Sequence, residues 1–195
     1  MILSNLLNFV YQDSNHLTCS NVLVGVVRVI KMFVISRTVF VLPMLRLCQY
    51  FSQKPRGGGK VMYYLAVKRY GRLCDLYNVE LPVSITLGRG CCFPHKFPLV
   101  INSQAEIGEN CIIHPCVVIG RDRSKEGAPK IGKNCFIGHG AKIIGNPVIG
   151  DFCFITPGAF ISKDIQSYSV VGVGVNNVLS DKGESMVRLY SSSIA

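Results

Sequence analysis

An isoleucine recurs every six residues through the second half of the chain. It occupies positions 107, 113, 119, 131, 137, 143, 149, 155 and 161, and only Lys125 interrupts the series. An amphipathic α-helix repeats its apolar positions at spacings of three and four, so a spacing of six excludes that structure. A six-residue unit instead fits a short extended strand followed by a turn.

Two further positions of the unit are restricted to small residues. Glycine follows the isoleucine at 108, 120, 132, 138 and 150, and a small residue often stands four positions after it: Cys111, Val117, Cys135, Ala141, Cys153 and Ala159. Glycine and asparagine supply turns, and three such units in succession close one triangular coil. Stacked coils place the isoleucines above one another inside, and the cysteines fill corners as small hydrophobes. The repeat therefore predicts an all-β parallel β-helix.

The repeat is broken in two places. Lys125 would put an unpaired charge into the core, so Arg121–Ala128 is predicted to form a loop outside the coil. Insertions in repeat folds often lie on the binding face, which makes Arg121 and Ala128 candidate substrate-binding residues. Leu87, Phe93 and Leu99 follow an earlier phase, and the register is predicted to slip by two residues between Leu99 and Ile107, an irregular region that includes the surroundings of His95.

The region before the repeat has a different pattern. Residues 61–78 predict an α-helix with Lys68, Arg69 and Arg72 on its polar side, and 52–60 reads as a linker. Residues 21–48 are mostly apolar, but they contain four basic residues: Arg28, Lys31, Arg37 and Arg46. The segment therefore does not reach the roughly 18 uncharged positions that a membrane span requires. The predicted organisation is a helical N-terminal extension (1–78), a β-helix (79–180) and a C-terminal tail (181–195).

The charge of the chain limits the partners and the cellular location that we expect. The chain has 21 Lys+Arg against 11 Asp+Glu, a formal charge of +10, concentrated before residue 83. Without a sustained basic run or a nucleic-acid-binding motif, a nucleic-acid partner is not expected. Two readings of the basic region stay open, helices packed on the main domain and peripheral contact with an anionic membrane. No charged segment opens a signal peptide, because the first basic residue is Arg28, so a cytoplasmic location is expected, with the inner membrane face as an option.

The nine cysteines do not point to disulfide or metal chemistry. A cytoplasmic chain does not maintain a disulfide framework, and paired C-x-x-C spacing, the usual mark of a structural zinc site, is absent. No metal is therefore expected.

The repeat text resembles the hexapeptide-repeat acyltransferases, and within them the serine acetyltransferase branch, which includes O-acetyltransferases of bacterial surface polysaccharides. The matching segments are VELPVSITLGRGCCFPH (79–95), INSQAEIGENCIIHPCVVIG (101–120) and PKIGKNCFIGHGAKIIGNPVIGDFCFITPGAFISKDI (129–165). The resemblance implies a left-handed coil, a homotrimer with active sites between subunits, and acetyl-CoA as the donor.

Transfer of an acetyl group to an alcohol requires a base that removes the hydroxyl proton, and a histidine suits this task. Of the four histidines, His16 lies in a polar stretch and reads as an exposed residue. The resemblance implies that His95 is the general base and that Glu80, which precedes it by a little less than one coil, is its acidic partner. His114 is a candidate for substrate contact. A rival mechanism, an acyl-cysteine formed on Cys91 or Cys92 with His95 as base, is weighed against the direct transfer that the family uses.

The resemblance also implies a groove for acetyl-CoA beside coils 131–166. Residues with little side chain would let pantetheine approach the backbone, and lysines would meet the phosphates, although Asn177 stands where the family usually has a cation. The candidate cofactor-binding residues are Gly138, His139, Gly140, Ala141, Lys142, Gly158 and Lys163.

The acceptor is where the chain departs from its serine-specific relatives. Those members carry a histidine at the end of the loop before PKI, whereas this chain has Ala128 after a remade loop. A sugar hydroxyl of a surface polysaccharide or its precursor is therefore the predicted acceptor, with L-serine of cysteine biosynthesis as the alternative. A non-enzymatic β-helix scaffold is the other class considered. The spacing of His95, His114 and His139 does not reproduce a γ-type carbonic anhydrase.

Overall fold

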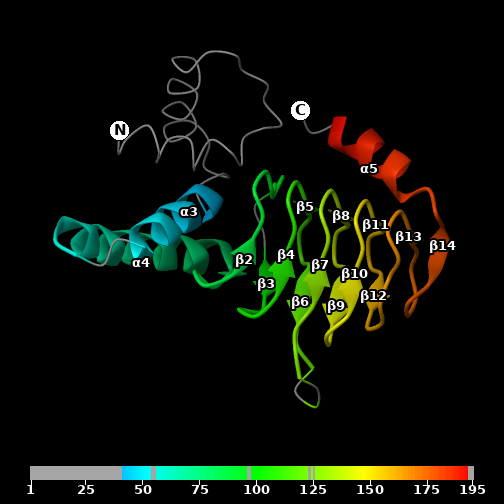
Figure 1. The fold of residues 1–195 in the computed structure, drawn as a ribbon, viewed down its shortest axis with the longest axis horizontal. Helices are drawn as coiled ribbons and strands as arrows, with labels where there is room; N and C mark the ends of the chain where they lie inside the picture. The colour runs from blue at the N-terminus through cyan, green and yellow to red at the C-terminus, as the bar shows by residue number, and fades with distance from the viewer. Residues whose placement is uncertain (1–40, 54–55, 96–97, 123, 125, 193–195) are drawn as a thin grey trace. The chain divides into compact units, whose positions relative to one another are not determined.

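The computed structural model describes residues 41–53, 56–95, 98–122, 124 and 126–192. The chain divides into two compact units, one ending at Tyr77 and one beginning at Asn78, and each is described by itself (Figure 1). Several residues considered above lie outside the described residues: His16, Arg28, Lys31, Arg37 and Lys125.

The first unit contains two helices that pack on each other, α3 (Val41–Ser52) and α4 (Gly58–Tyr77). The helix predicted over 61–78 is confirmed, with Lys68, Arg69 and Arg72 exposed. It begins earlier than expected, at Gly58, so the end of the predicted linker is helical. Gly57, at a φ of 57°, precedes the helix in a conformation that glycine adopts without a steric penalty. Among the described residues, no helix is long and apolar enough to cross a membrane.

The second unit is a left-handed parallel β-helix with three sheets, here called A, B and C (Figure 1). Sheet A contains β1 (Val79–Glu80), β3 (Leu99–Ile101), β6 (Val118–Gly120), β9 (Lys142–Ile144) and β12 (Phe160–Ile161). Sheet B contains β2 (Thr86–Leu87), β4 (Glu106–Ile107), β7 (Lys130–Ile131) and β10 (Val148–Ile149). Sheet C contains β5 (Ile112–Ile113), β8 (Phe136–Ile137), β11 (Phe154–Ile155), β13 (Val170–Val171) and β14 (Val178–Ser180).

The isoleucine ladder forms the interior, as predicted. Strand register places Ile113, Ile137 and Ile155 on consecutive coils of sheet C, and all three are fully buried. The other isoleucines of the series are buried in the same way, and the small corner residues are completely inaccessible. Because each coil leaves its apolar edge uncovered until the next coil stacks on it, the core is continuous along the helix axis.

Four cysteines form a column at one corner, which we call the thiol ladder. Cys91, Cys111, Cys135 and Cys153 are all fully buried and free. Each Sγ lies 3.2 Å from a backbone carbonyl oxygen of the following coil: those of Gly108, Gly132, Gly150 and Gln166, respectively. The prediction of small hydrophobes is confirmed and extended, because each S–H group is also provided with an acceptor, and Cys91 joins the column.

The predicted loop explains why the six-residue phase continues past Lys125. Ile113 pairs with Ile137, four repeat units further along the chain, whereas Ile137 pairs with Ile155 after the usual three units. The additional unit lies between β6 and β7, in the exposed segment from Arg121 onward. An insertion of one repeat length leaves the phase unchanged.

The register slip lies earlier than the sequence analysis placed it. Cys92 forms a bridge with Ile112, and Val100 pairs with Val118. The chain from Cys92 to Val100 is therefore two residues longer than the chain from Ile112 to Val118. The two additional positions therefore fall between Cys92 and Val100, in the segment that contains His95. The expected position after Leu99 was wrong because Leu99 fills the corner position, next to Val117, and Ile101 carries the ladder position.

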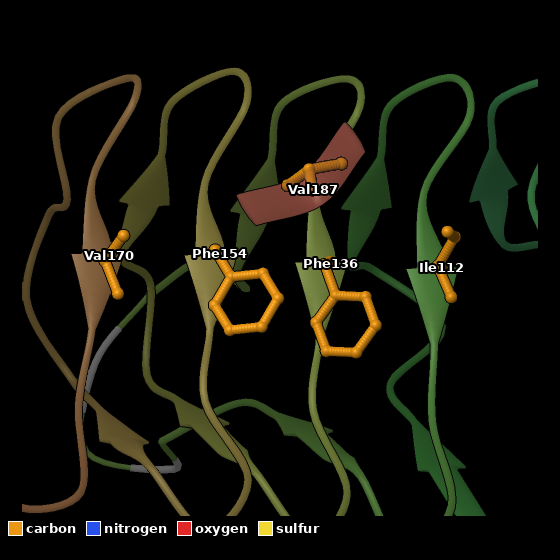
Figure 2. Packing of buried hydrophobic residues seen from close by; sticks show 5 residues of the cluster. All are labelled: Ile112, Phe136, Phe154, Val170 and Val187. Carbon is orange, nitrogen blue, oxygen red and sulfur yellow. The ribbon is translucent and has the colours of Figure 1, made fainter. Parts of the chain in front are cut away.

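The C-terminal segment is a structural element that the sequence analysis treated only as a tail. β14 pairs antiparallel with β13, and α5 (Gly183–Ser192) follows. Val187 of α5 lies over the outer face of sheet C, against side chains that point away from the coil interior (Figure 2). These outward residues are Ile112, Phe136, Phe154 and Val170. The start of α5 is closely packed, since a Cβ on Gly183 would lie 2.4 Å from the carbonyl oxygen of Phe152.

Candidate active site

Three histidines occupy the turns that lead from sheet C to sheet A, on successive coils. His95 lies between the Cys92 bridge and β3, His114 between β5 and β6, and His139 between β8 and β9. We call this group the histidine corner. Two features of the sequence create it, the two-residue slip at His95 and the placement of His114 and His139 just beyond core isoleucines.

His114 is the enclosed member of the group. Its ring centroid lies 5.7 Å from that of His95 in an edge-on arrangement and 4.7 Å from that of Phe136. Its Nε2 atom is buried without a hydrogen-bond partner. Burial, followed by the nearby His95 and His139, lowers the pKa of His114 below its ordinary value of 6.5, which favours the neutral imidazole.

His95 and His139 are exposed at the same corner. Exposure leaves His95 open to a substrate hydroxyl, as a general base requires. Its proposed partner Glu80 is exposed on β1, opposite Val100 of β3, the strand that follows His95. Glu80 therefore lies on the strand next to β3, and His95 lies in the turn that precedes β3; the orienting role of Glu80 stays a prediction.

The two cysteines of the rival mechanism have structural places. Cys91 is fully buried in the thiol ladder, where its Sγ lies 3.2 Å from the carbonyl oxygen of Gly108. Cys92 packs against the apolar cluster on the outer face of sheet C. The burial of Cys91 speaks against this residue as the nucleophile, because a nucleophilic thiol must reach the substrate as an exposed thiolate.

The predicted pantetheine wall contains a strip of bare backbone that continues the histidine corner. Gly140 and Gly158 follow His139 and Pro157 in the corresponding turns, with φ angles of 69° and 74°, and a Cβ on either would meet nothing within 4 Å. We call these two glycines the bare strip. Gly138 and Ala141 are buried, Ala141 completely, so neither offers a surface to a ligand in one chain. Lys142 and Lys163 are exposed, on β9 and after β12.

The predicted acceptor residues of the loop lie elsewhere on the coil. Arg121 and Ala128 belong to the turn from sheet A to sheet B, at the other end of the sheet A strands from the histidine corner. Arg121 is exposed and its Nη1 donates to Gln104 Oε1 at 3.3 Å, whereas Ala128 is buried. Within one β-helix, the structure does not bring these residues to His95.

The sequence analysis missed the aromatic residues beside His114. Phe136 stacks on Phe154 with ring centroids 4.6 Å apart, and Tyr190 of α5 lies 5.1 Å from each of these rings. The available signal was the phenylalanine directly before a ladder isoleucine at both 136 and 154. Such a position points outward, so a bulky apolar residue there indicates a covering element.

Two further features of the described residues, their possible metal ligands and a surface groove, add no residue to the predicted site. No three side chains among them converge as metal ligands, although three histidines share a corner. A groove of about 470 Å³ runs along sheet B and includes Thr86, Gly132 and Ser167. It contains an ion pair of 2.8 Å between Glu106 and Lys130.

Comparison with known proteins agrees with the repeat. Residues 128–163 match the family model described as bacterial transferase hexapeptide (six repeats). The serine acetyltransferase of Synechococcus elongatus is 33% identical over 101 residues, which cover 50% of this chain and 41% of that protein. A probable serine acetyltransferase of Oryza sativa is 34% identical over 125 residues, 63% of this chain and 41% of that protein. The chain thus spans about two fifths of the length of these relatives.

Solved structures share the fold. A serine acetyltransferase of Brucella abortus in complex with coenzyme A has a TM-score of 0.68 at 21% identity, covering 91% of this chain and 68% of that one. The serine acetyltransferase of Neisseria gonorrhoeae in complex with serine has a TM-score of 0.67 at 19% identity, covering 91% and 70%.

The coil geometry and the repeat match define the class, a hexapeptide-repeat protein with a left-handed β-helix. Within that class, the sequence relatives that this chain resembles are serine acetyltransferases.

Proposed function

We propose that the protein is an acetyl-CoA-dependent O-acetyltransferase of the serine acetyltransferase type. The observation that carries the proposal is the histidine corner, where the exposed His95 and, two and three coils further along, the bare strip lie at the same edge of the β-helix. The strip suits an extended pantetheine arm, and the exposed imidazole suits removal of a hydroxyl proton. The names of the sequence relatives support the same chemistry.

The reaction follows from the neutral form of His95. Its imidazole takes the proton of the acceptor hydroxyl while the oxygen attacks the thioester carbonyl. The C–S bond then breaks, and the imidazolium returns the proton to the departing thiolate, giving an acetyl ester and free CoA. Holding both substrates at one corner makes the attack effectively unimolecular. No acyl-cysteine is required.

L-Serine is the acceptor that the comparisons support, and cysteine biosynthesis is then the setting. The relatives are named serine acetyltransferases, and one structural neighbour was solved in complex with serine. A specific observation favours a second candidate, a sugar hydroxyl: the buried Ala128 stands where serine-specific members carry a histidine. The expected surface-polysaccharide acceptor has no support among the comparisons and is kept as the second candidate.

A homotrimer is part of the proposal. In one chain the loop from Arg121 and the histidine corner lie at opposite ends of the sheet A strands. If the loop contacts the acceptor, it must come from a second copy that packs beside the first, which a closed ring of heterologous interfaces provides.

The test is release of CoA thiol from acetyl-CoA by purified protein, measured with L-serine and with a panel of sugars and nucleotide sugars. We expect turnover with L-serine, and His95→Ala should lower kcat by about 10²-fold or more. Turnover with sugars alone would transfer the proposal to the second candidate. An absence of acceptor-dependent thiol release, or a fully active His95→Ala variant, would overturn it.

A further inference from the structure

A chain of ring contacts connects the C-terminal helix to the histidine corner. Tyr190 of α5 lies 5.1 Å from Phe136, Phe136 lies 4.7 Å from His114, and His114 lies 5.7 Å from His95, all between ring centroids. Neighbouring rings in these arrangements have favoured relative orientations. A shift of the first ring therefore reaches the last through contacts rather than across open space.

The outer end of this chain is anchored. Val187, one turn before Tyr190, is buried against the outer face of sheet C (Figure 2). Phe136 and Phe154 stack within 9° of parallel, and Tyr190 contacts both. At the other end of α5, Gly183 donates its N–H to the carbonyl oxygen of Tyr168 at 2.6 Å. The helix thus gives Tyr190 a defined place on the β-helix.

His114 is poorly suited to transferring protons itself. Both ring nitrogens of an imidazolium are donors, and its buried Nε2 atom has no acceptor. Protonation would therefore bury an unpaired charged donor, which is costly. The role left for His114 is steric, as a neutral ring packed between Phe136 and His95.

We propose that His114 and Tyr190 are positioning residues for His95, with Tyr190 acting through Phe136 and His114. The C-terminal helix thereby becomes part of the active site without touching the substrate. This inference rests on the proposed role of His95 as general base.

The first test compares Tyr190→Ala with Tyr190→Phe. Removing the ring leaves Phe136 without its neighbour on α5, so His114 and His95 should sample more orientations. Since a small misplacement of reacting groups can cost up to 10²-fold in rate, we expect kcat to fall about tenfold with the KM for acetyl-CoA unchanged. Tyr190→Phe keeps the ring and should restore kcat. Leu189→Ala, at a position 64% exposed on the same helix, is the matched control and should behave as wild type.

A double-mutant cycle tests the route of the effect. Because Tyr190 acts through His114, Tyr190→Ala should lower kcat no further in a His114→Ala protein, whereas independent residues would give multiplied losses. His114→Phe should retain kcat within about threefold, since a ring remains. If Tyr190→Ala fails to fold, the comparison of His114→Phe with His114→Ala still decides the question.

Three results would overturn the inference: wild-type kcat for a folded Tyr190→Ala or His114→Ala variant, multiplied losses in the cycle, or a His114→Phe variant as inactive as His95→Ala. Parallel measurement of His95→Ala separates this from a failure of the proposed function. An active His95→Ala variant would show that His95 is not the general base and would refute the proposed function. If His95→Ala is inactive but Tyr190→Ala keeps wild-type kcat, only the positioning role is refuted.

Discussion

The three histidines of the corner are chemically identical side chains in different surroundings. His95 and His139 are exposed, whereas His114 is enclosed and its Nε2 atom is buried. Burial is the main reason that the pKa of His114 is lowered from 6.5. The difference follows from position in the repeat, because His114 directly follows the inward Ile113, while His139 stands one residue further into its turn.

The lowered pKa of His114 predicts how stability depends on pH. As the pH falls through 6.5, the unfolded chain gains a proton on this histidine that the folded chain does not take up, so the free energy of unfolding decreases. Urea unfolding from about pH 8 to about pH 5 should show a steeper loss for wild type than for His114→Phe, which lacks the group. Parallel curves for the two proteins would contradict this expectation.

Cys116 predicts a residue-scale gain in stability. It is an exposed residue with a φ of 58°, in the turn position that Gly140 and Gly158 occupy on later coils. At another corner, Asn110 and Asn134 adopt the same conformation, which asparagine tolerates better than most side chains. Cys116→Asn should raise the free energy of unfolding by up to about 1 kcal/mol, measured by urea denaturation. Cys116→Ala keeps the strain and serves as control; an equal gain there would rule out the conformational explanation.

At the scale of elements, the glycine after the ladder isoleucine sets how closely coils stack. A Cβ on Gly108 would lie 2.6 Å from backbone atoms of Gly132 on the next coil, which cannot move aside. Gly108→Ala should therefore cost about 1–3 kcal/mol, as overpacking does. At Gly120 the nearest atom is the flexible end of Ile144, 3.2 Å away, so Gly120→Ala should stay within about 0.5 kcal/mol. Thermal and urea unfolding of the pair test this, and equal losses would refute the stacking argument.

The sequence was sufficient for some elements because their pattern is local and repeated. The isoleucine ladder, the corner cysteines and the loop after Arg121 all follow from a six-residue phase. Leu99 was misassigned because an apolar residue suits both the ladder and the corner position. Only strand pairing, which is non-local, shows that Ile101 aligns with Ile119.

At the candidate site, the irregular surroundings of His95 were predictable, whereas the roles of the site residues stay predictions. His95 stood out because the phase breaks around it, and the structure places the break there. The contribution of Tyr190 was not predictable from its own segment, because its significance comes from packing on Phe136, which lies several coils earlier in the chain. Contacts between segments so distant leave no periodic trace in the sequence.

At the scale of the whole molecule, the separation of the loop from the histidine corner predicts complementation between copies. Replacing residues 121–126 by glycine and serine should inactivate the enzyme if the loop contacts the acceptor, as His95→Ala should. When the two inactive chains are unfolded and refolded together, about a quarter of the sites in random trimers should combine an intact loop with an intact His95. Thiol release measures the recovery.

Two controls accompany the complementation experiment. The same chains mixed after separate refolding should remain inactive, and light scattering should report three copies per particle. Refolded mixtures without activity, or an active monomer, would contradict the proposed assembly.

The antiparallel closure of sheet C has a consequence for solubility at high concentration. A β-helix is a column that could in principle grow by stacking one molecule's last coil on another's first, because an unpaired strand edge is a template for further strands. Here β14 pairs with the edge of β13. Leu179 packs closely on Gly172, since a Cβ on Gly172 would lie 2.6 Å from Leu179 Cδ1. The β13–β14 hairpin thus covers this edge of sheet C. The C-terminal segment, which also contains α5, thereby opposes end-to-end polymerisation into fibres.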